Sequence, residues 1–306
     1  MLPEVLPLRQ ASRELVRELG FLSGRDAASG LSHSHCHALI EIEARGALAQ
    51  SELPALLRLD KSTTSRIVAE LDARGWVKAK PHETDGRVRI LSLTAKGKAK
   101  VDLVHREANA RVESALDLLG ESERDAVLRG MQLYARALER ARRRSAFDTR
   151  PAKSKDREGI ASLIRTVMPE FGAKGPGFAI NDPEVDDMPA TYDVPRAHYW
   201  VVVRKDDDRV VGGGGYAELV GGGPATCELR KMYFLPEVRG LGFGQELLEK
   251  CIAGATKHGY ARMYLETLTN MTQAKKLYEK NGFLPLERPL GKTGHFGCDS
   301  FYVRAL

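Results

Sequence analysis

Apolar residues in the first half of the chain recur every three or four positions, which is the spacing of amphipathic helices. In the segment that Ser32 can cap, for example, an apolar stripe continues until Gly46. The pattern then changes to two strand-like runs around Asp85-Gly86, a turn signal that predicts a hairpin over 77–93. The predicted helices of this half are 8–19, 32–45, 51–59, 60–77, 95–119 and 121–144.

The second half alternates between helical and strand-like patterns. Residues 145–156 are polar and contain a proline, so we expect a linker that merges into a first strand. Residues 169–195 are rich in Gly, Pro and Asp, as expected of a loop on the substrate side of a site. The four glycines 212–215 are expected to let a strand lie close to neighbouring backbone. The predicted elements are a helix over 157–167, strands over 199–204 and 209–219, a strand that ends before Pro236, a helix over 245–252, a strand over 262–267, a helix that begins near Asn270, and a C-terminal strand.

Length and composition indicate a soluble globular protein with about two domains. Of its 306 residues, 42% are hydrophobic and 29% are charged, and no apolar run approaches the roughly 18 residues that span a bilayer. The first ten residues have neither a basic start nor an apolar signal core, so we expect a cytoplasmic protein with no membrane partner. The four cysteines have no C-x-x-C spacing, which indicates neither a disulfide framework nor a cysteine zinc site.

Positive charge is concentrated in the first half of the chain. Residues 1–145 contain 25 Lys and Arg against 20 Asp and Glu, whereas residues 146–306 contain 22 against 21. Because a basic excess favours polyanions, any nucleic-acid partner is expected to bind residues 1–145.

The clearest chemical motif lies between Cys227 and Gly254, where a strand-like run, a loop with three glycines and a helix follow one another. Glycines at 240, 242 and 244 allow a ligand to approach the backbone, and the helix start adds N–H groups and a positive dipole end. This arrangement predicts a diphosphate site. No Lys-Ser/Thr pair follows the last glycine and no G-x-G-x-x-G fingerprint is present, so neither a nucleotide P-loop nor a dinucleotide site is indicated.

The order Arg239-x-x-Gly242-x-Gly244 resembles motif A of the GNAT acetyltransferases, which follows a strand and holds the diphosphate of acetyl-coenzyme A. The run 262–267 and the segment from Asn270 to Phe283 resemble the second half of that family's signature. The resemblance implies an α+β GNAT acyltransferase fold with a mixed central sheet over 146–306, and acetyl-CoA as the cofactor. A flexible turn before a core helix is the alternative interpretation of 240–244. The resemblance implies that the coenzyme contacts Met232, Phe234, Arg239, Gly240, Leu241, Gly242, Phe243, Gly244, Asn270 and Tyr278.

The same resemblance suggests catalytic residues. It places Glu228 where many GNAT enzymes keep a carboxylate base for the amine, and Tyr278 where a tyrosine protonates the leaving thiolate. The alternatives are an edge-strand surface charge for Glu228 and a core tyrosine for Tyr278. His295 is a second candidate base, because an unperturbed imidazole pKa near ~6.5 suits that role. Cys298 is not expected to carry the acyl group, since GNAT enzymes usually transfer it directly.

Hydroxyl and cationic side chains crowd the first turns of the segment that begins at Asp60, as a helix entering the major groove requires. Together with the basic hairpin that follows, this is the pattern of a winged helix. The sequences LDKSTTSRIVAELDARGWV, DGR and LSLTAKGKA resemble the MarR family of regulators, over roughly Leu8 to Arg144. The resemblance implies a mostly α winged helix-turn-helix fold in which Arg87 enters the minor groove; a solvated surface charge is the alternative. The candidate DNA-binding residues are Lys61, Ser62, Thr63, Ser65, Arg66, Asp85 and Arg87.

The MarR resemblance also implies a homodimer, in which the two long helices pack with the first helix of each subunit. A dimer of residues 1–145 presents two recognition helices to a pseudo-palindromic operator. His33, His35 and His37 suggest a metal site, but on a helix His35 points away from the other two and no third ligand is identified. We therefore expect no metal.

Together, the two resemblances predict a bifunctional transcriptional regulator and acetyl-CoA-dependent N-acetyltransferase. The acceptor is expected to be a small amine or an amino-acid-like metabolite. Two alternatives stay open: a regulator whose GNAT-like domain binds acetyl-CoA as a signal, and a protein-lysine acetyltransferase. The presence of both Glu228 and Tyr278 favours the enzyme.

Overall fold

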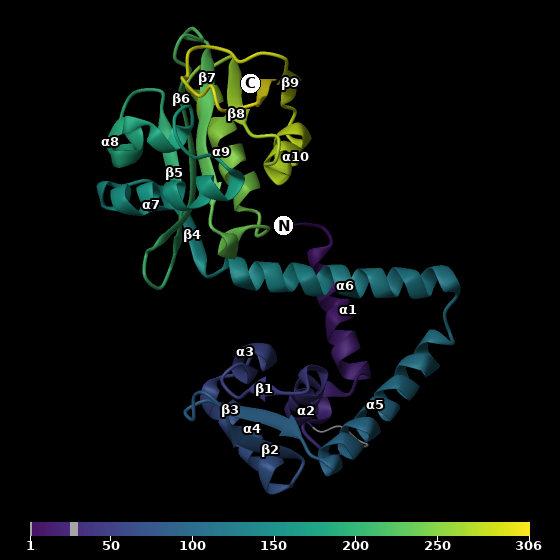
Figure 1. The fold of residues 1–306 in the computed structure, drawn as a ribbon. Helices are drawn as coiled ribbons and strands as arrows, with labels where there is room; N and C mark the ends of the chain where they lie inside the picture. The colour runs from purple at the N-terminus through teal and green to yellow at the C-terminus, as the bar shows by residue number, and fades with distance from the viewer. Residues whose placement is uncertain (1, 25–29) are drawn as a thin grey trace. The chain divides into compact units, whose positions relative to one another are not determined.

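The computed structural model describes residues 2–24 and 30–306 and contains two compact units, residues 1–128 and 129–306 (Figure 1). The division falls within α6 (Glu121–Arg144). The domain boundary predicted at 145/146 lies at the end of the same helix and stays a prediction. Among the described residues, no helix combines the length and the apolarity that crossing a membrane requires.

The first unit is mostly helical and contains a small antiparallel sheet. The sheet has the order β1-β3-β2, and β2 pairs with β3 as the predicted hairpin. Leu39, Ile42, Leu71 and Leu91 are fully buried in its core. These features confirm the predicted winged-helix fold class. The elements up to α6 are α1 (Val5–Glu18), η1 (Phe21–Ser23), α2 (His33–Arg45), β1 (Leu48–Ala49), α3 (Leu53–Leu57), α4 (Lys61–Ala73), β2 (Val77–Pro81), β3 (Arg89–Leu93) and α5 (Ala95–Leu116).

Side-chain caps determine where two of these helices begin. Ser32 accepts a hydrogen bond from the His35 N–H at 3.4 Å at the start of α2, as predicted. Asp60 accepts one from the Thr63 N–H at 2.8 Å at the start of α4. Each cap satisfies an amide that has no partner within its helix, which stabilises the helix by about 1 kcal/mol.

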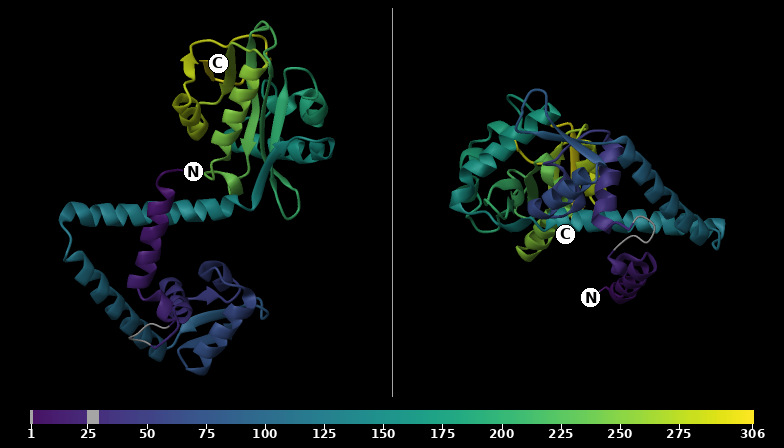
Figure 2. Two further views of the ribbon diagram at one scale, coloured as in Figure 1. Left: turned by 180° about the vertical axis from the view of Figure 1, so that it is seen from behind. Right: turned by 90° about the horizontal axis from the view of Figure 1, so that it is seen from below.

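The second unit is a seven-stranded sheet with helices on both faces, which confirms the predicted α+β fold. The strand order is β4-β5-β6-β7-β8-β10-β9; β7 and β8 run parallel and the other neighbours antiparallel, so the sheet is mixed. Figures 1 and 2 show α7 and α9 on opposite faces of the sheet, and both pack on β6 and β7. The main elements are β4 (Phe147–Pro151), α7 (Arg157–Val167), α8 (Met188–Thr191), β5 (His198–Arg204), β6 (Val210–Glu218), β7 (Thr226–Phe234), α9 (Phe243–Lys257), β8 (Arg262–Thr267), α10 (Thr272–Lys280), β9 (Leu284–Leu286) and β10 (Ser300–Ala305).

The segment 145–156, predicted as a linker that merges into a first strand, contains the strand β4. β4 pairs antiparallel with β5 and forms one edge of the sheet. Pro151 ends this edge strand, where a missing N–H is tolerated. The expected first strand is therefore present. It begins close to the start of the segment, and the sequence did not separate it from the linker because its pairing partner lies much later in the chain and a polar edge strand resembles a loop in sequence.

The glycine run of β6 lies close to neighbouring backbone, as predicted. A Cβ on Gly215 would lie 2.3 Å from the His198 carbonyl oxygen, and one on Gly213 would lie 2.7 Å from the Tyr199 hydroxyl. Side chains at these positions would force β5 and β6 apart.

The strands β7 and β8 diverge after a short parallel stretch. Their pairing joins Thr226–Glu228 of β7 to residues 262–264 of β8, whereas β7 continues to Phe234. Lys231 has a φ of 52°, and the register between β6 and β7 shifts opposite it, between Gly213 and Gly215. Within the described chain, residues 229–234 therefore have no strand partner on the β8 side, and a cleft opens there.

Candidate functional site

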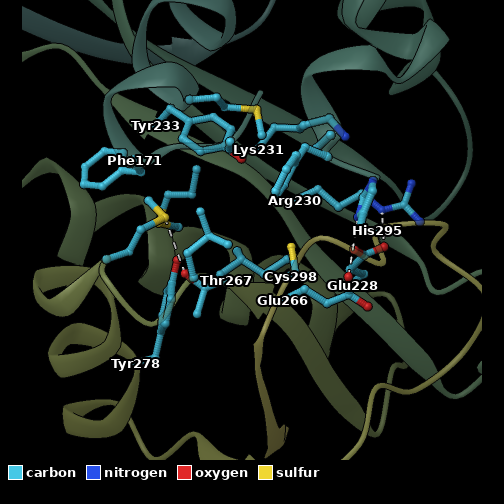
Figure 3. Close-up of a pocket in the computed structure, with 18 residues that line it drawn as sticks. Phe171, Glu228, Arg230, Lys231, Tyr233, Glu266, Thr267, Tyr278, His295 and Cys298 are labelled. Carbon is cyan, nitrogen blue, oxygen red and sulfur yellow. Dashed lines mark hydrogen bonds and ion pairs between the residues drawn. The ribbon is translucent and has the colours of Figure 1, made fainter. Parts of the chain in front are cut away.

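A cavity of about 60 Å³ lies in the gap between β7 and β8 (Figure 3). Phe171 and Tyr278 lie toward one end of it, and the charged side chains Glu228, Glu266 and His295 lie toward the other. A wider hollow of about 340 Å³ shares part of the same lining, including Phe171. The cleft therefore has a narrow inner chamber with an apolar end and a charged end.

The predicted diphosphate loop connects β7 to α9. Gly242 caps α9 with a φ of 93°, a left-handed conformation that strains any side chain. The side chains of Leu241 and Phe243 are buried, so these residues can offer a ligand only their main chain. The first amides of α9 have no acceptor within the helix, and the helix dipole adds positive potential. This set of donors fits the diphosphate of acetyl-CoA. The loop and the end of β7 contain Met232, Phe234, Arg239, Gly240, Leu241, Gly242, Phe243 and Gly244.

Arg144, the last residue of α6, contacts this loop. Its Nη1 donates to the Leu241 carbonyl at 2.8 Å, and its Nη2 pairs with Glu246. Its Cζ also lies 4.2 Å from the centroid of the Phe243 ring, within the range of a cation–π contact. The end of α6 therefore holds the loop in place through three residues around Gly242.

Arg239 and Asn270 make hydrogen bonds to protein groups at the mouth of the cleft. Arg239 donates to the Phe234 carbonyl at 2.8 Å and pairs with Glu170 at 2.7 Å. Asn270 donates to the Phe171 carbonyl at 2.9 Å and precedes α10, which begins two residues later than predicted. Both side chains lie near the loop or the wider hollow, where a coenzyme arm would pass.

Two groups that keep their protons line the cavity. Burial raises the pKa of Tyr278, whose ring packs beside Phe283 and Tyr302 at centroid distances of 5.8 and 6.4 Å. Burial also raises the pKa of the Cys298 thiol to about 12. Tyr278 is therefore a neutral proton donor, and Cys298 is a poor nucleophile at neutral pH.

Glu228 lies on β7 just before the strands diverge and is only 4% exposed. Burial raises its pKa, although Arg230, whose Nε donates to Glu228 Oε2 at 2.6 Å, opposes the rise. Arg230 Nη1 also lies 3.7 Å from Glu184, and Lys231 Nζ lies 2.8 Å from the same carboxylate. Glu228 is thus a buried carboxylate in an ion-pair cluster rather than a surface charge.

The ion pairs continue to the other wall of the cavity. Lys231 also pairs with Asp182, and His295 Nε2 lies 2.8 Å from Asp182 Oδ2. His295 Nδ1 lies 3.6 Å from Glu266 Oε2. Burial disfavours the charged imidazole, but the two carboxylates outweigh it and raise the pKa of His295 to about 9. These contacts favour the protonated imidazole at neutral pH, which argues against His295 as a second base; that role stays a prediction. The charge network, as we name it, consists of Glu228, Arg230, Glu184, Lys231, Asp182, His295 and Glu266.

In the first unit, the N-terminal turns of α4 expose most of the residues predicted to contact DNA. Ser62 and Thr63 donate their hydroxyl hydrogens to the Asp60 carboxylate at 2.6 and 2.7 Å, and Arg66 donates to Thr63 Oγ1 at 3.2 Å. These two hydroxyls thus complete the helix cap in this structure, and the exposed cations remain available to phosphates. The exposed residues are Lys61, Ser62, Ser65 and Arg66, and Thr63 is half-buried.

The hairpin between β2 and β3 presents Arg87 at its tip. The Asp85 carboxylate accepts hydrogen bonds from the Arg87 N–H at 3.1 Å and from its Nε at 3.2 Å. These hydrogen bonds lower the pKa of Asp85. The Arg87 side chain is nevertheless 93% exposed, so it is oriented by Asp85 and still reaches solvent.

Two of the three histidines at the start of α2, His33 and His35, make side-chain contacts within the protein. His35 lies between Ser32 Oγ at 2.6 Å and Glu70 at 3.0 Å, and His33 packs edge-on against Phe21 at 4.7 Å. In residues 2–24 and 30–306, no three His, Cys, Asp or Glu side chains are grouped so that they could hold a metal ion.

Each half of the chain matches a known family. The sequence model of the MarR family matches residues 29–88, and that of the acetyltransferase (GNAT) family matches residues 163–283. The uncharacterized N-acetyltransferase YjgM of Escherichia coli K12 is 40% identical over 152 residues, which cover 49% of this chain and 90% of that protein. An uncharacterized HTH-type transcriptional regulator of Mycobacterium bovis is 30% identical over 118 residues, covering 39% of this chain and 80% of that protein. The chain belongs to both families.

The chain thus carries a MarR-type regulator domain and a GNAT N-acetyltransferase domain. A crystal structure of a GNAT-family acetyltransferase from Staphylococcus aureus Mu50 aligns with 52% of this chain and 99% of its own, at 20% identity and a TM-score of 0.46.

Sequence analysis missed several charged residues of the GNAT cleft. Glu266 could have been recognised from the sequence, because it lies two residues after Tyr264 in β8. Residues two apart in a strand lie on the same face, and Tyr264 is fully buried. The sequence gives no such indication for Lys231, Asp182 or Arg144, because their roles depend on partners that are distant in the sequence.

Proposed function

We propose that the chain is a DNA-binding regulator and an acetyl-CoA-dependent N-acetyltransferase that acts on a small amine. The observation that carries the enzymatic part is the cleft between the diverging strands β7 and β8, lined by the neutral Tyr278 and the buried Glu228. Acetyl-CoA, when bound, supplies the activated acetyl group. The catalytic domain on this proposal is residues 146–306, and the DNA-binding domain is residues 1–145.

The proposal gives each part of the cleft a role. The amides that begin α9, with the loop glycines and Arg239, hold the coenzyme diphosphate. Main-chain N–H groups near Met232 and Phe234 polarise the thioester carbonyl, and Asn270 contacts the pantetheine arm. Glu228 removes a proton from the amine, and the Tyr278 hydroxyl donates one to the departing sulfur.

A thiol-release assay over a panel of amines tests the enzymatic proposal. Acetyl-CoA should bind, and at least one amine should release CoA thiol at a rate above that of hydrolysis. Binding of acetyl-CoA without turnover of any amine, or of a lysine peptide, would favour the signalling alternative instead.

One observation favours a sensing role beside the enzymatic one. Arg144 ends the helix α6, which the MarR resemblance places at the dimer interface, and it also contacts the diphosphate loop at Leu241 and Glu246. A change in the loop on coenzyme binding would therefore reach α6 directly.

The Arg144→Gln variant is expected to bind acetyl-CoA about 5- to 10-fold more weakly, because the loop loses a partly buried ion pair and a hydrogen bond to a carbonyl. Calorimetric titration measures the change. Arg142→Gln is the matched control, since it removes the same charge from an exposed position in the same helical turn. Equal affinities of the two variants would exclude a role for Arg144 in the loop.

We also propose that the MarR domain binds a pseudo-palindromic operator as a homodimer. The contacts on this proposal come from Lys61, Ser62, Thr63, Ser65 and Arg66 on α4, and from Arg87, which Asp85 orients. Large apolar side chains exposed on α1 and α6 support an interface with a second copy. They include Leu6, Leu8, Leu15, Val16, Val127, Leu128, Met131, Leu133, Tyr134 and Leu138.

The Arg87→Ala variant is expected to bind DNA about 10-fold more weakly. The slope of log affinity against log salt should also become shallower by about 0.9 for each DNA phosphate that Arg87 no longer neutralises. The probe is the duplex that the wild-type protein selects from a random library, titrated at several salt concentrations. Arg288→Ala removes an equal charge from an exposed position after β9 in the GNAT domain and serves as the control. An unaltered slope in Arg87→Ala would argue against DNA binding by the wing.

A further inference from the structure

The charge network of the GNAT cleft ends in a carboxylate on both sides. It alternates in sign from Glu228 to Glu266 and contains four carboxylates but only three cations, so its net charge is −1 when His295 is protonated. Each cation contacts two carboxylates, and the terminal carboxylates each contact one cation. The network therefore lacks one positive charge, and the carboxylates at both of its ends line the cavity.

Glu266 has an oxygen without a hydrogen bond. Its Oε1 accepts hydrogen bonds from the Tyr264 hydroxyl at 2.8 Å and from Thr293 Oγ1 at 2.9 Å. Its Oε2 is buried and has no hydrogen-bond partner among the described residues, and the 3.6 Å to His295 Nδ1 is too long for one. Only 3% of the side chain is exposed. Leaving a buried charged acceptor unsatisfied is costly, so this atom is suited to a donor that arrives with a ligand.

We propose that the acceptor is a primary amine that binds as its ammonium ion at Glu266 Oε2, and that Glu266 receives the proton which this ion must lose before it attacks. The second proton, which the nitrogen loses once it has bonded to the acetyl carbon, is the one that Glu228 removes. This proposal rests on the acetyltransferase function proposed above. In the proton transfer, an N–H bond breaks and an O–H bond forms on Glu266, while the electron pair stays on the nitrogen and makes it nucleophilic. Glu228 is less suited to bind the ammonium ion, because it is already paired with Arg230 at 2.6 Å, whereas Glu266 lies 3.6 Å from His295, the cation with which it pairs.

The same charges define the class of amine. An ammonium ion brings the net charge of the network to zero. An α-amino acid also carries a carboxylate, which would have no unpaired cation to bind, because the three cations of the network are already paired. The inner cavity of about 60 Å³ also leaves little room beside the nitrogen. We therefore expect plain amines to be favoured over the corresponding α-amino acids.

Matched acceptor pairs test the class with the wild-type protein. Tyramine and histamine are each compared with the corresponding amino acid, L-tyrosine or L-histidine, in a thiol-release assay with saturating acetyl-CoA. The amines should have kcat/KM values at least about 10-fold higher, a difference of about 1.4 kcal/mol. Equal or higher values for the amino acids would overturn the proposal without affecting the acetyltransferase function itself.

A binding measurement tests the proposed ammonium site at Glu266 without requiring turnover. Propylammonium and propionate are added in turn to the full-length protein, and the ¹H–¹⁵N signals of the His295 ring, assigned with a His295→Gln variant, are followed by NMR. Propylammonium should shift these signals and propionate should not. A shift with propionate, or no shift with propylammonium, would overturn the proposal, whereas failure to bind acetyl-CoA would overturn the proposed function.

The Glu266→Gln variant tests whether the ammonium ion binds at Glu266. It should lower kcat/KM for amines at least about 10-fold and abolish the response to propylammonium, while acetyl-CoA affinity and Tm stay near wild type. Glu287→Gln, in the exposed loop after β9, is the matched control and should behave as wild type. An unchanged response in Glu266→Gln would show that the ammonium ion binds elsewhere. If this variant does not fold, the wild-type comparisons still decide the proposal.

Discussion

The Gly242→Glu variant is expected to bind acetyl-CoA at least about 100-fold more weakly than the wild-type protein, a loss of about 2.7 kcal/mol. Gly242 has a φ of 93°, and a Cβ there would lie 3.1 Å from Arg144 Nη1. The new carboxylate would also stand at the amides that begin α9, where it would compete with the diphosphate and repel it. Calorimetric titration with acetyl-CoA measures the loss.

Gly259→Glu is the matched control for this experiment. Gly259 has a φ of 77° after the end of α9, and a Cβ there meets no atom within 4 Å. The substitution therefore carries a similar backbone strain and the same added charge, but far from the first turn of the helix. It should leave acetyl-CoA affinity unchanged, and both variants should bind DNA as the wild type does. Wild-type coenzyme affinity in Gly242→Glu would refute the diphosphate site.

The Tyr278→Phe variant should lower kcat by about 100-fold, the usual scale of a lost general acid, and leave the Kd for acetyl-CoA within about 2-fold of wild type. Phenylalanine keeps the packing against Phe283 and Tyr302 but has no proton to donate. Because burial raises the pKa of Tyr278, the wild-type hydroxyl carries its proton throughout the neutral range. Steady-state rates with a reactive amine and a separate coenzyme titration measure the two effects.

Tyr302→Phe is the control for the loss of a hydroxyl. Tyr302 lies next to Tyr278, but its hydroxyl donates to Glu279 at 3.0 Å and the residue does not line the cavity. This variant should keep the wild-type kcat, with at most a small loss of stability from the missing hydrogen bond. Equal rates in Tyr278→Phe and the wild type would remove Tyr278 from the mechanism.

Elements with local signals were predicted well. The helix α7 has the predicted bounds, 157–167, and α2 begins after the Ser32 cap and ends before Gly46. The hairpin around Asp85-Gly86 and the glycine loop before α9 also lie where the sequence places them. In each case a cap, a turn residue or a helical period lies within a few positions of the element that it determines.

Predictions that depend on distant partners were less complete. The segment that contains β4 was interpreted as a linker merging into a strand, without a boundary between them, because only pairing with β5 defines the strand. His295 was assigned an unperturbed imidazole, whereas Asp182 and Glu266 raise its pKa to about 9. Glu228 was left between a base and a surface charge, and its burial in the charge network removes the second interpretation.

The sequence alone was sufficient to identify the two families, the order of their elements and the glycine loop, because those features are encoded by residues close together in the chain. Tertiary structure decided which charged groups meet in the cleft. Arg144 and Leu241 are 97 residues apart, and His295 and Asp182 are 113 apart. No local period or motif in the sequence predicts such pairs. The sheet and the loops around it bring these residues within hydrogen-bonding distance and bury them where their charges interact strongly.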